Sequence, residues 1–350
     1  MTSLNTPLCD LLGCEYPIIQ TAMGWIADPK LVAGTCNAGG FGFLAGATIP
    51  PDQLEVEILK TRELTVKPFG MNFHMYQPNA ADIVKLVIKH GIRAVSYSRS
   101  PGPELIKCLK DAGVVCMPTV GLLKHAIRAV ELGADAVTVQ GGEGGGHTGP
   151  VPTTLLLPQV VDVVDVPVAA AGGFKDGRGL VAALAFGAAG IAMGTRFLMT
   201  AESPVPPETL ARYQTEKDPS NIIISRQVDG MPQRMIMNEL LTDLEKKSGP
   251  GLLLTAIKNG LSYRKFTGAS AFDLLKSAMA MRSKDSLSVA QIMMSANAPM
   301  MIQKAMVEGR PAEGILPSGQ VAAMIDDLPT CEELIHRIIA QARETLTALQ

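Results

Sequence analysis

Short hydrophobic runs alternate with longer amphipathic segments along the first two hundred residues. The runs number eight: Tyr16–Gln20, Phe41–Ala45, Pro68–Phe73, Ala94–Tyr97, Val114–Pro118, Ala136–Val139, Val166–Ala171 and Gly190–Met193. Between them, apolar residues spaced three and four apart predict helices, for example at Ala81–His90, Pro103–Ala112, Leu122–Leu132 and Gly179–Phe186. Strands that alternate with helices pair in parallel through right-handed crossovers. We therefore expect an α/β protein with the eight units of a (β/α)8 TIM barrel. The strand count leaves an open doubly wound sheet as the alternative.

The alternating pattern stops after Thr200. Helical segments broken by polar turns follow, at Pro207–Tyr213, Met237–Lys247, Leu252–Asn259, Ala271–Met281 and Val289–Ser295. The run Ile222–Gly230 is either a strand or an extended crossing segment, and Cys331–Leu349 predicts a long final helix. We expect a barrel over residues 1–200 and a mostly helical substrate or lid domain over 201–310. We expect residues 311–350 to return to the barrel.

Composition narrows the functional classes. The formal charge is −2 and 47% of the residues are hydrophobic, so the chain is neither a basic nucleic-acid or membrane binder nor a disordered protein. The first ten residues lack the basic-then-apolar pattern of a secretory signal, and the six cysteines form no CxxC pair. We expect a cytoplasmic protein with reduced cysteines. The oligomeric state stays open, a homo-oligomer included.

Glycines gather after the seventh and eighth runs, as Ala171-Gly172-Gly173 and as Gly194-Thr195. In a barrel these two loops form the usual phosphate site, and glycine lets backbone N–H groups approach an anion. Tight strand-to-helix turns are the structural alternative. Because two adjacent loops share the pattern, we favour phosphate binding.

The loop after the sixth run is the richest in glycine, from Gln140 to Pro150, and it contains His147. Ordering so many glycines costs entropy, so packing alone is a weak reason for them. A strand-end histidine there can act as a general acid or base near neutral pH. The alternative is a surface histidine without a role. No spacing in the chain suggests a metal site, a nucleophile elbow or a Walker-type loop.

With these loops in place, the chain resembles the nitronate monooxygenase (2-nitropropane dioxygenase) family of FMN-dependent barrels, whose relatives include enoyl reductases and quinone reductases. The matching motifs are Pro17–Gln20, Asn37–Gly40, Pro68–Asn72, Gly144–Gly149, Ala171–Gly173, Met193–Phe197 and Ser318–Gln320. The resemblance implies that His147 is catalytic. It implies FMN contacts at Ala22, Met23, Asn72, Gln140, Gly145, Gly146, Ala171, Gly172, Gly173, Gly194, Thr195, Gly319 and Gln320.

Further motifs resemble the IpdC-type branch of this family, from bacterial steroid C/D-ring degradation. They are the run from Val139 to Pro158, Val228–Pro232 and Asp326–Pro329. This resemblance implies an oxidoreductase that introduces a ring double bond into a hydrindane-carboxyl-CoA thioester, with FMN as hydride acceptor and NAD(P) as an electron partner. Candidate contacts for the CoA tail are Arg196, Arg226, Arg264 and Lys265, with a solvated surface as the alternative. Competing functions are a nitronate monooxygenase, an NAD(P)H:quinone reductase and a non-catalytic flavin-binding barrel.

Overall fold

All eight hydrophobic runs form parallel strands in the computed structural model, which describes residues 4–75, 79–98, 103–246 and 297–350. Strands that follow one another in the chain are neighbours in the sheet, and each pair is hydrogen-bonded in parallel. In chain order they are β1 (Ile18–Gln20), β2 (Phe41–Leu44), β3 (Gly70–Asn72), β4 (Ala94–Ser96), β5 (Val115–Cys116), β6 (Thr119–Val120), β7 (Val137–Gln140), β9 (Val168–Ala171) and β10 (Gly190–Met193).

The fifth run is a single strand that is interrupted at Met117 and Pro118, so it carries two labels. On one side, Met117 N donates to Val95 O at 2.9 Å, which continues the pairing with β4. On the other side, Thr138 N donates to Pro118 O at 2.8 Å, which continues the pairing with β7. Pro118 has no N–H to give to either ladder. Because both edges of this strand are paired, the sheet closes into the predicted barrel and the open-sheet alternative is wrong.

The barrel interior is filled by large and small side chains in alternation. Phe41 and Phe43 lie edge to face with ring centroids 5.1 Å apart, and alanines from the facing strands leave room for them. Leu8 and Leu12 of the first helix, α1 (Pro7–Leu12), join the same buried cluster. Such a filled interior is a packed core, so the chemistry falls to the loops at the carboxyl ends of the strands.

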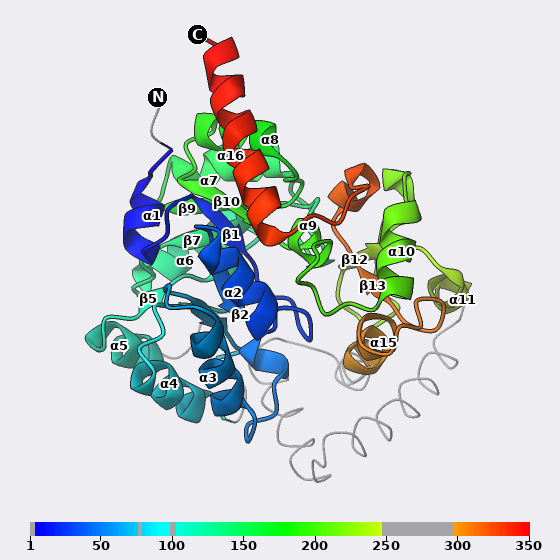
Figure 1. Ribbon diagram of the computed structural model, residues 1–350, viewed down its shortest axis with the longest axis horizontal. Helices are drawn as coiled ribbons and strands as arrows, with labels where there is room; N and C mark the ends of the chain where they lie inside the picture. Colours follow the sequence, from blue (N-terminus) through cyan, green and yellow to red (C-terminus); the bar gives the residue numbers. More distant parts are fainter. Residues whose placement is uncertain (1–3, 76–78, 99–102, 247–296) are drawn as a thin grey trace. The chain divides into compact units, whose positions relative to one another are not determined.

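Helices surround this barrel in the order that the repeat predicts (Figure 1). The last helix, α16, packs against both α8 and α2, the seventh and the first helices of the ring, and so completes it as the eighth. The packing with α8 is close, since a Cβ added at Gly177 would lie 2.4 Å from Ala342 N. The ring comprises α2 (Pro29–Asn37), α3 (Leu54–Leu64), α4 (Ala80–Lys89), α5 (Pro103–Asp111), α6 (Leu123–Glu131), α7 (Thr153–Val161), α8 (Gly177–Ala185) and α16 (Cys331–Ala348), with a 3-10 turn η1 (Gly46–Thr48) after β2.

The chain divides into two compact units, and the second is inserted between the eighth strand and the eighth helix. The barrel unit comprises residues 1–144, 148–204 and 324–350, and the second unit comprises 145–147 and 205–323. After the short helix α9 (Thr195–Leu198), the chain leaves the barrel unit and later returns beside its own exit. Ala201 N donates to Pro329 O at 2.9 Å, and the Glu202 carboxylate accepts from Cys331 N at 2.9 Å.

The second unit contains a small antiparallel sheet that the sequence did not predict. Strand β12 (Gln233–Ile236) pairs with β11 (Ile222–Ser225), β13 (Leu316–Pro317) and the two-residue β8 (Gly146–His147). Thus Ile222–Gly230 begins as a strand and ends as a turn. The helices expected at 207–213 and 237–247 are confirmed, and those expected at 252–259, 271–281 and 289–295 lie outside the described residues. The observed elements are α10 (Pro207–Thr215), η2 (Pro219–Asn221), α11 (Glu239–Lys246), α15 (Asn297–Met306) and η3 (Gln320–Met324).

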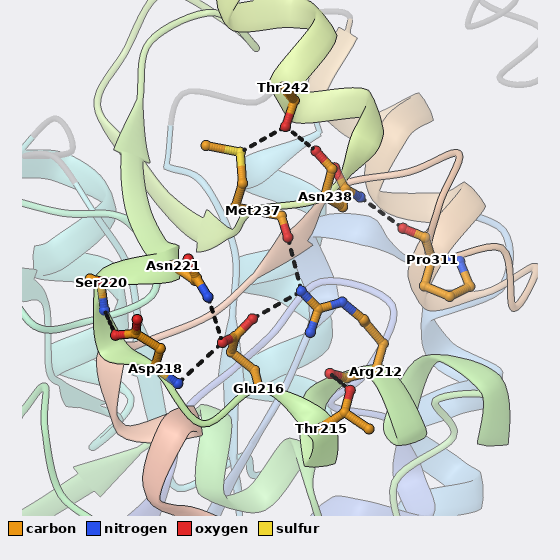
Figure 2. Close-up of polar contacts among 10 residues, drawn as sticks. All are labelled: Arg212, Thr215, Glu216, Asp218, Ser220, Asn221, Met237, Asn238, Thr242 and Pro311. Carbon is orange, nitrogen blue, oxygen red and sulfur yellow. Dashed lines mark hydrogen bonds and ion pairs between the residues drawn. The ribbon is translucent and has the colours of Figure 1, made fainter.

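A polar network ties α10 to the start of β11 and the end of β12 (Figure 2). Arg212 forms an ion pair with the buried Glu216 at 2.9 Å and also donates to Met237 O. The second carboxylate oxygen of Glu216 accepts from Asn221 Nδ2 at 3.1 Å and from Asp218 N at 3.2 Å. Burial by itself would raise the pKa of Glu216, but these partners outweigh it and hold the pKa below its usual range.

No helix in the described part of the chain is long and apolar enough to cross a membrane.

Candidate active site

Two glycines at the carboxyl end of β9 adopt a backbone conformation that other residues rarely take. Gly172 and Gly173 have φ angles of +98° and +84°. A Cβ added at Gly172 would lie 3.1 Å from both Gly141 O and Gly144 N, so there is also little space for a side chain. The sequence therefore needs glycine at Gly172 for two separate reasons.

The backbone amide groups of these glycines are candidates for binding an anion. Among the described residues, the N–H groups of Gly172, Gly173 and Gly194 have no hydrogen-bond acceptor. Gly194 follows β10, the direct neighbour of β9 in the sheet. Unsatisfied N–H groups at two adjacent strand ends suit an anion such as a phosphate group.

The glycine-rich loop is held in a fixed shape by Glu143. Its carboxylate accepts from the backbone N of Thr153 at 2.9 Å and from the Thr153 hydroxyl at 2.7 Å. Thr153 is the first residue of α7, so Glu143 caps that helix from the loop that precedes it. A Cβ at Gly141 would lie only 2.0 Å from Thr153 Oγ1, which explains one of the many glycines.

Other expected flavin contacts lie at the same ends of the barrel strands. Asn72, the last residue of β3, donates from Nδ2 to Ser96 O at 2.9 Å, which fixes the orientation of its amide. Gln140 ends β7, and its side-chain amide lies against the backbone of Gly144. A Cβ at Gly194 would lie 3.5 Å from Met23 Sδ. Ala22 lies shortly after β1, Ala171 is the last residue of β9, and Thr195 begins α9.

Trp25, in the loop between β1 and α2, is a residue that the sequence analysis did not single out. Among the described residues it is the only non-glycine residue with a positive φ, +61°. Its backbone N donates to Thr48 Oγ1 at 3.0 Å, which holds this strained conformation in place. The loop also carries Ala22 and Met23, both expected flavin contacts.

In the second unit, His147 is paired with a buried carboxylate. His147 Nε2 lies 2.9 Å from Asp229 Oδ2, and the Asp229 side chain is only 3% exposed. The histidine side chain itself is 54% exposed, so solvent or a substrate can reach it. A histidine held by a buried carboxylate is a common arrangement for acid–base catalysis.

The second unit also brings together glycines that are far apart in the sequence. A Cβ added at Gly145 would lie 2.6 Å from Gly319 N, so these two backbones are in direct contact. Gly146 has a φ of +65° and pairs with Arg234 in the sheet. Gln320 begins η3 directly after Gly319.

The four cations expected to hold a CoA tail have different environments. The Arg196 side chain is 2% exposed and forms an ion pair with Asp327 at 2.9 Å, so it cannot meet a solvent-exposed ligand. Arg226 lies exposed at the start of the turn after β11, while Arg264 and Lys265 lie outside the described residues. We therefore leave Arg196 out of the proposed substrate contacts.

Instead, Arg196 belongs to a charge bridge inside the barrel unit. The Asp327 carboxylate also binds Arg337 at 2.8 Å, so it links α9 to the eighth helix of the ring. Burial by itself would raise the pKa of Asp327, but Arg196 and Arg337 outweigh it and hold the pKa below its usual range. This bridge fixes the segment that follows Gly194 and Thr195.

Sequence reasoning missed three residues that hold candidate residues in place. They are Glu143 in the barrel unit and Asp229 and Gln233 in the second unit. Asp229 lies 82 positions from His147, and no local pattern reports a contact at that separation. Its only signal was the motif Val228–Pro232, which entered through resemblance alone.

Comparisons with known proteins show the family to which this chain belongs. The family model described as nitronate monooxygenase matches residues 5–98 and 83–341. The chain is 49% identical to a protein of Rhodococcus jostii over 100% of this chain and 99% of the relative, and 46% identical to one of Mycobacterium tuberculosis over 97% and 96%. Both relatives are named (3aS,4S,5R,7aS)-5-hydroxy-7a-methyl-1-oxo-octahydro-1H-indene-4-carboxyl-CoA dehydrogenase.

A solved structure supports the same assignment. FabK from Thermotoga maritima superposes with a TM-score of 0.79 at 29% identity, covering 99% of this chain and 98% of that one. The family match spans both units, and the two relatives are similar to this chain along nearly its whole length. The chain belongs to the nitronate monooxygenase family of oxidoreductases.

Proposed function

We propose that this chain is an FMN-dependent dehydrogenase that introduces a ring double bond into a hydrindane-carboxyl-CoA thioester in the cytoplasm. The observation that carries the proposal is the 49% identity to a hydrindane-carboxyl-CoA dehydrogenase over the whole chain. The similarity therefore includes the second unit, where substrate-specific residues are expected, as well as the barrel.

The barrel unit supplies groups that fit FMN. The N–H groups of Gly172, Gly173 and Gly194, which have no acceptor in the part of the chain that the structure describes, would hold the phosphate, with Thr195 beside them. Asn72 and Gln140, at the ends of β3 and β7, would contact the ribityl chain or the ring. Bound FMN would supply a two-electron acceptor for hydride.

His147 supplies the proton chemistry. Oxidation beside a thioester removes a proton from the α-carbon and a hydride from the β-carbon, which leaves a carbon–carbon double bond. His147 takes the α-proton as general base, and the buried Asp229 stabilises the charge that then forms on the ring. Bound FMN would accept the hydride, and NAD(P) would then take up the two electrons.

The CoA tail needs a local cationic contact. Arg226 is exposed and lies in the same turn as Asp229, so it is the candidate that the described residues support. Arg264 and Lys265 stay predictions.

Anaerobic mixing of the FMN-loaded protein with a hydrindane-carboxyl-CoA ester tests the proposal. We expect bleaching of the flavin absorbance and a product that is two hydrogens lighter, whereas the free acid without CoA should bleach it much more slowly. Adding NAD or NADP should then restore the yellow form. No bleaching by the thioester would reject the proposed substrate.

The family match favours one alternative, a nitronate monooxygenase. Aerobic turnover of propyl 2-nitronate, at a rate well above that of the thioester, would favour this alternative. NADH or NADPH oxidation with a quinone in place of both substrates would point to a quinone reductase.

A further inference from the structure

The carboxylate of Asp229 is surrounded by donors. Besides His147 Nε2 at 2.9 Å, the same oxygen accepts a hydrogen bond from Gln233 Nε2. The second oxygen accepts from Met231 N at 3.0 Å. Asp229 and Gln233 are 3% and 2% exposed, so these contacts are shielded from water. A buried carboxylate with three donors is held in one orientation.

The sheet of the second unit sets this arrangement. In the pairing of β8 with β12, His147 lies directly opposite Gln233. Asp229 sits in the turn that joins β11 to β12, and Gly230, with a φ of +82°, makes that turn possible. The pairing of β8 with β12 therefore positions both side-chain partners of the carboxylate, His147 and Gln233.

The chemistry of the contact determines which imidazole nitrogen carries the proton. An ionised carboxylate can only accept hydrogen bonds, so His147 Nε2 must donate. In the neutral imidazole the other nitrogen then bears the lone pair. Resting on the proposed function, we infer that Asp229 is a positioning residue that fixes His147 in the Nε2–H tautomer, so that Nδ1 takes the α-proton, while Gln233 holds Asp229 in place.

The proton balance follows. The α-carbon–hydrogen bond breaks and an N–H bond forms at His147 Nδ1. The electron pair left on the α-carbon forms the double bond as hydride leaves the β-carbon, and bound FMN would be its acceptor. The ring becomes an imidazolium cation next to the Asp229 anion, and the pair is then neutral overall. Replacing the carboxylate by an amide removes that compensation.

The tautomer can be measured without any substrate. The chain has only five histidines, so ¹⁵N–¹H spectra of the FMN-loaded protein at about pH 8.5, two units above the ordinary imidazole pKa, can resolve them. The signals that disappear in His147→Gln identify His147. We expect the pattern of a ring protonated at Nε2. A ring protonated at Nδ1 would overturn the inference, whatever the substrate proves to be.

Asp229→Asn is the matched variant. Because Met231 N must still meet an oxygen, the new amide places its NH₂ toward His147 and Gln233. The Gln233 amide then has to turn its oxygen toward this NH₂, and the His147 ring is driven into the other tautomer. We expect the ¹⁵N pattern to invert and kcat to fall by about 10²-fold or more, with FMN affinity and KM nearly unchanged. Asp218→Asn, an exposed carboxylate of the same unit, serves as the control and should change neither.

Gln233→Met keeps the inference falsifiable if Asp229→Asn does not fold. Loss of one donor to Asp229 should lower kcat by less than Asp229→Asn does and leave the tautomer a mixture. An unchanged tautomer together with full turnover of the best substrate would refute the inference, whether it is found in Asp229→Asn or, if that variant does not fold, in Gln233→Met. Failure of the thioester to react, with the Nε2–H tautomer present, would instead reject only the proposed substrate.

Discussion

The carboxylate of Glu143 accepts both the backbone amide and the hydroxyl of Thr153, at 2.9 and 2.7 Å. One side chain therefore caps α7 and fixes the glycine-rich loop that leads to His147. Glu143→Ala should destabilise the protein by about 1 kcal/mol, the usual cost of a lost helix cap, and weaken FMN binding. Urea denaturation and FMN titration measure the two effects. Glu143→Gln keeps one acceptor oxygen, so it should lie between the alanine variant and the native protein, and equal stability of all three would contradict the assignment.

Gly172→Ala should abolish tight FMN binding. The substitution forces a side chain into the left-handed region, which costs about 1–2 kcal/mol, and also places a Cβ 3.1 Å from backbone atoms of the loop. Gly91→Ala is the matched control, because Gly91 has a φ of +57° but nothing within 4 Å of the added Cβ. Both variants should lose stability, but only Gly172→Ala should lose FMN, as measured by equilibrium dialysis. Comparable FMN affinity in the two variants would count against the proposed phosphate site at Gly172, Gly173 and Gly194.

His147→Ala should keep FMN and lose turnover. General acid–base groups contribute about 10²–10⁴-fold, so we expect at least a tenfold fall in kcat with the flavin spectrum unchanged. His125→Ala, which alters an exposed histidine on α6, is the control and should retain full turnover. Full activity in His147→Ala would remove this residue from the mechanism.

Asp327→Ala should lower the stability of the folded protein more than Arg337→Ala does. The first variant leaves Arg196, 2% exposed, without its counter-charge, which typically costs about 3–5 kcal/mol, reduced here because Asp327 is 39% exposed. The second removes only an exposed partner, worth about 0–1 kcal/mol. Thermal and urea denaturation compare them. Equal free energies of unfolding of the two variants would show that the ion pair between Asp327 and Arg196 does not stabilise the protein.

The same bridge predicts a dependence on pH. The pKa of Asp327 is held below its usual range, so its stabilisation is present above the unfolded value of about 3.9 and is lost as the pH falls through the folded value. Denaturation between about pH 5 and pH 3 should therefore show a steeper loss of stability in the native protein than in Asp327→Asn. Parallel curves would show that other carboxylates dominate.

Trp25 should report FMN binding, because it is the only tryptophan in the chain and lies in the loop that carries Ala22 and Met23. Flavins absorb where tryptophan emits, so titrating FMN into the apoprotein should quench the emission in proportion to the bound fraction. Bound FMN, measured by its absorbance after filtration, without quenching would place the flavin away from this loop.

The barrel could be predicted from the sequence because each strand is a separate hydrophobic run and each helix keeps its periodicity. The insertion could not be read as fully. Strand β8, Gly146–His147, contains no hydrophobic residue, and β13, Leu316–Pro317, is only two residues long, so the antiparallel sheet was not predicted. For the same reason the partner of His147 was missed, since the register of β8 against β12 brings it close.

The burial of the charged residue Arg196 was also not predicted from the sequence. Arg196 follows Gly194 and Thr195 in a loop that reads as solvent-facing, and so it was expected at the substrate surface. Its burial depends on Asp327, a residue that follows the whole insertion in the chain and cannot be connected to it by local pattern. Gly172 and Gly173, by contrast, were predicted as site residues because the turn after β9 itself requires their positive φ angles.

The exit and return of the chain at Ala201 and Pro329 have a consequence for how this family can diversify. Since the two segments are hydrogen-bonded to one another, everything between them begins and ends at neighbouring points of the barrel unit. Such a junction tolerates replacement of the inserted piece, because chain ends that lie close together make domain insertion possible. Evolution, or a designer, can therefore exchange the inserted piece and with it most of the residues proposed to select the substrate, while Gly172, Gly173 and Gly194 stay as they are.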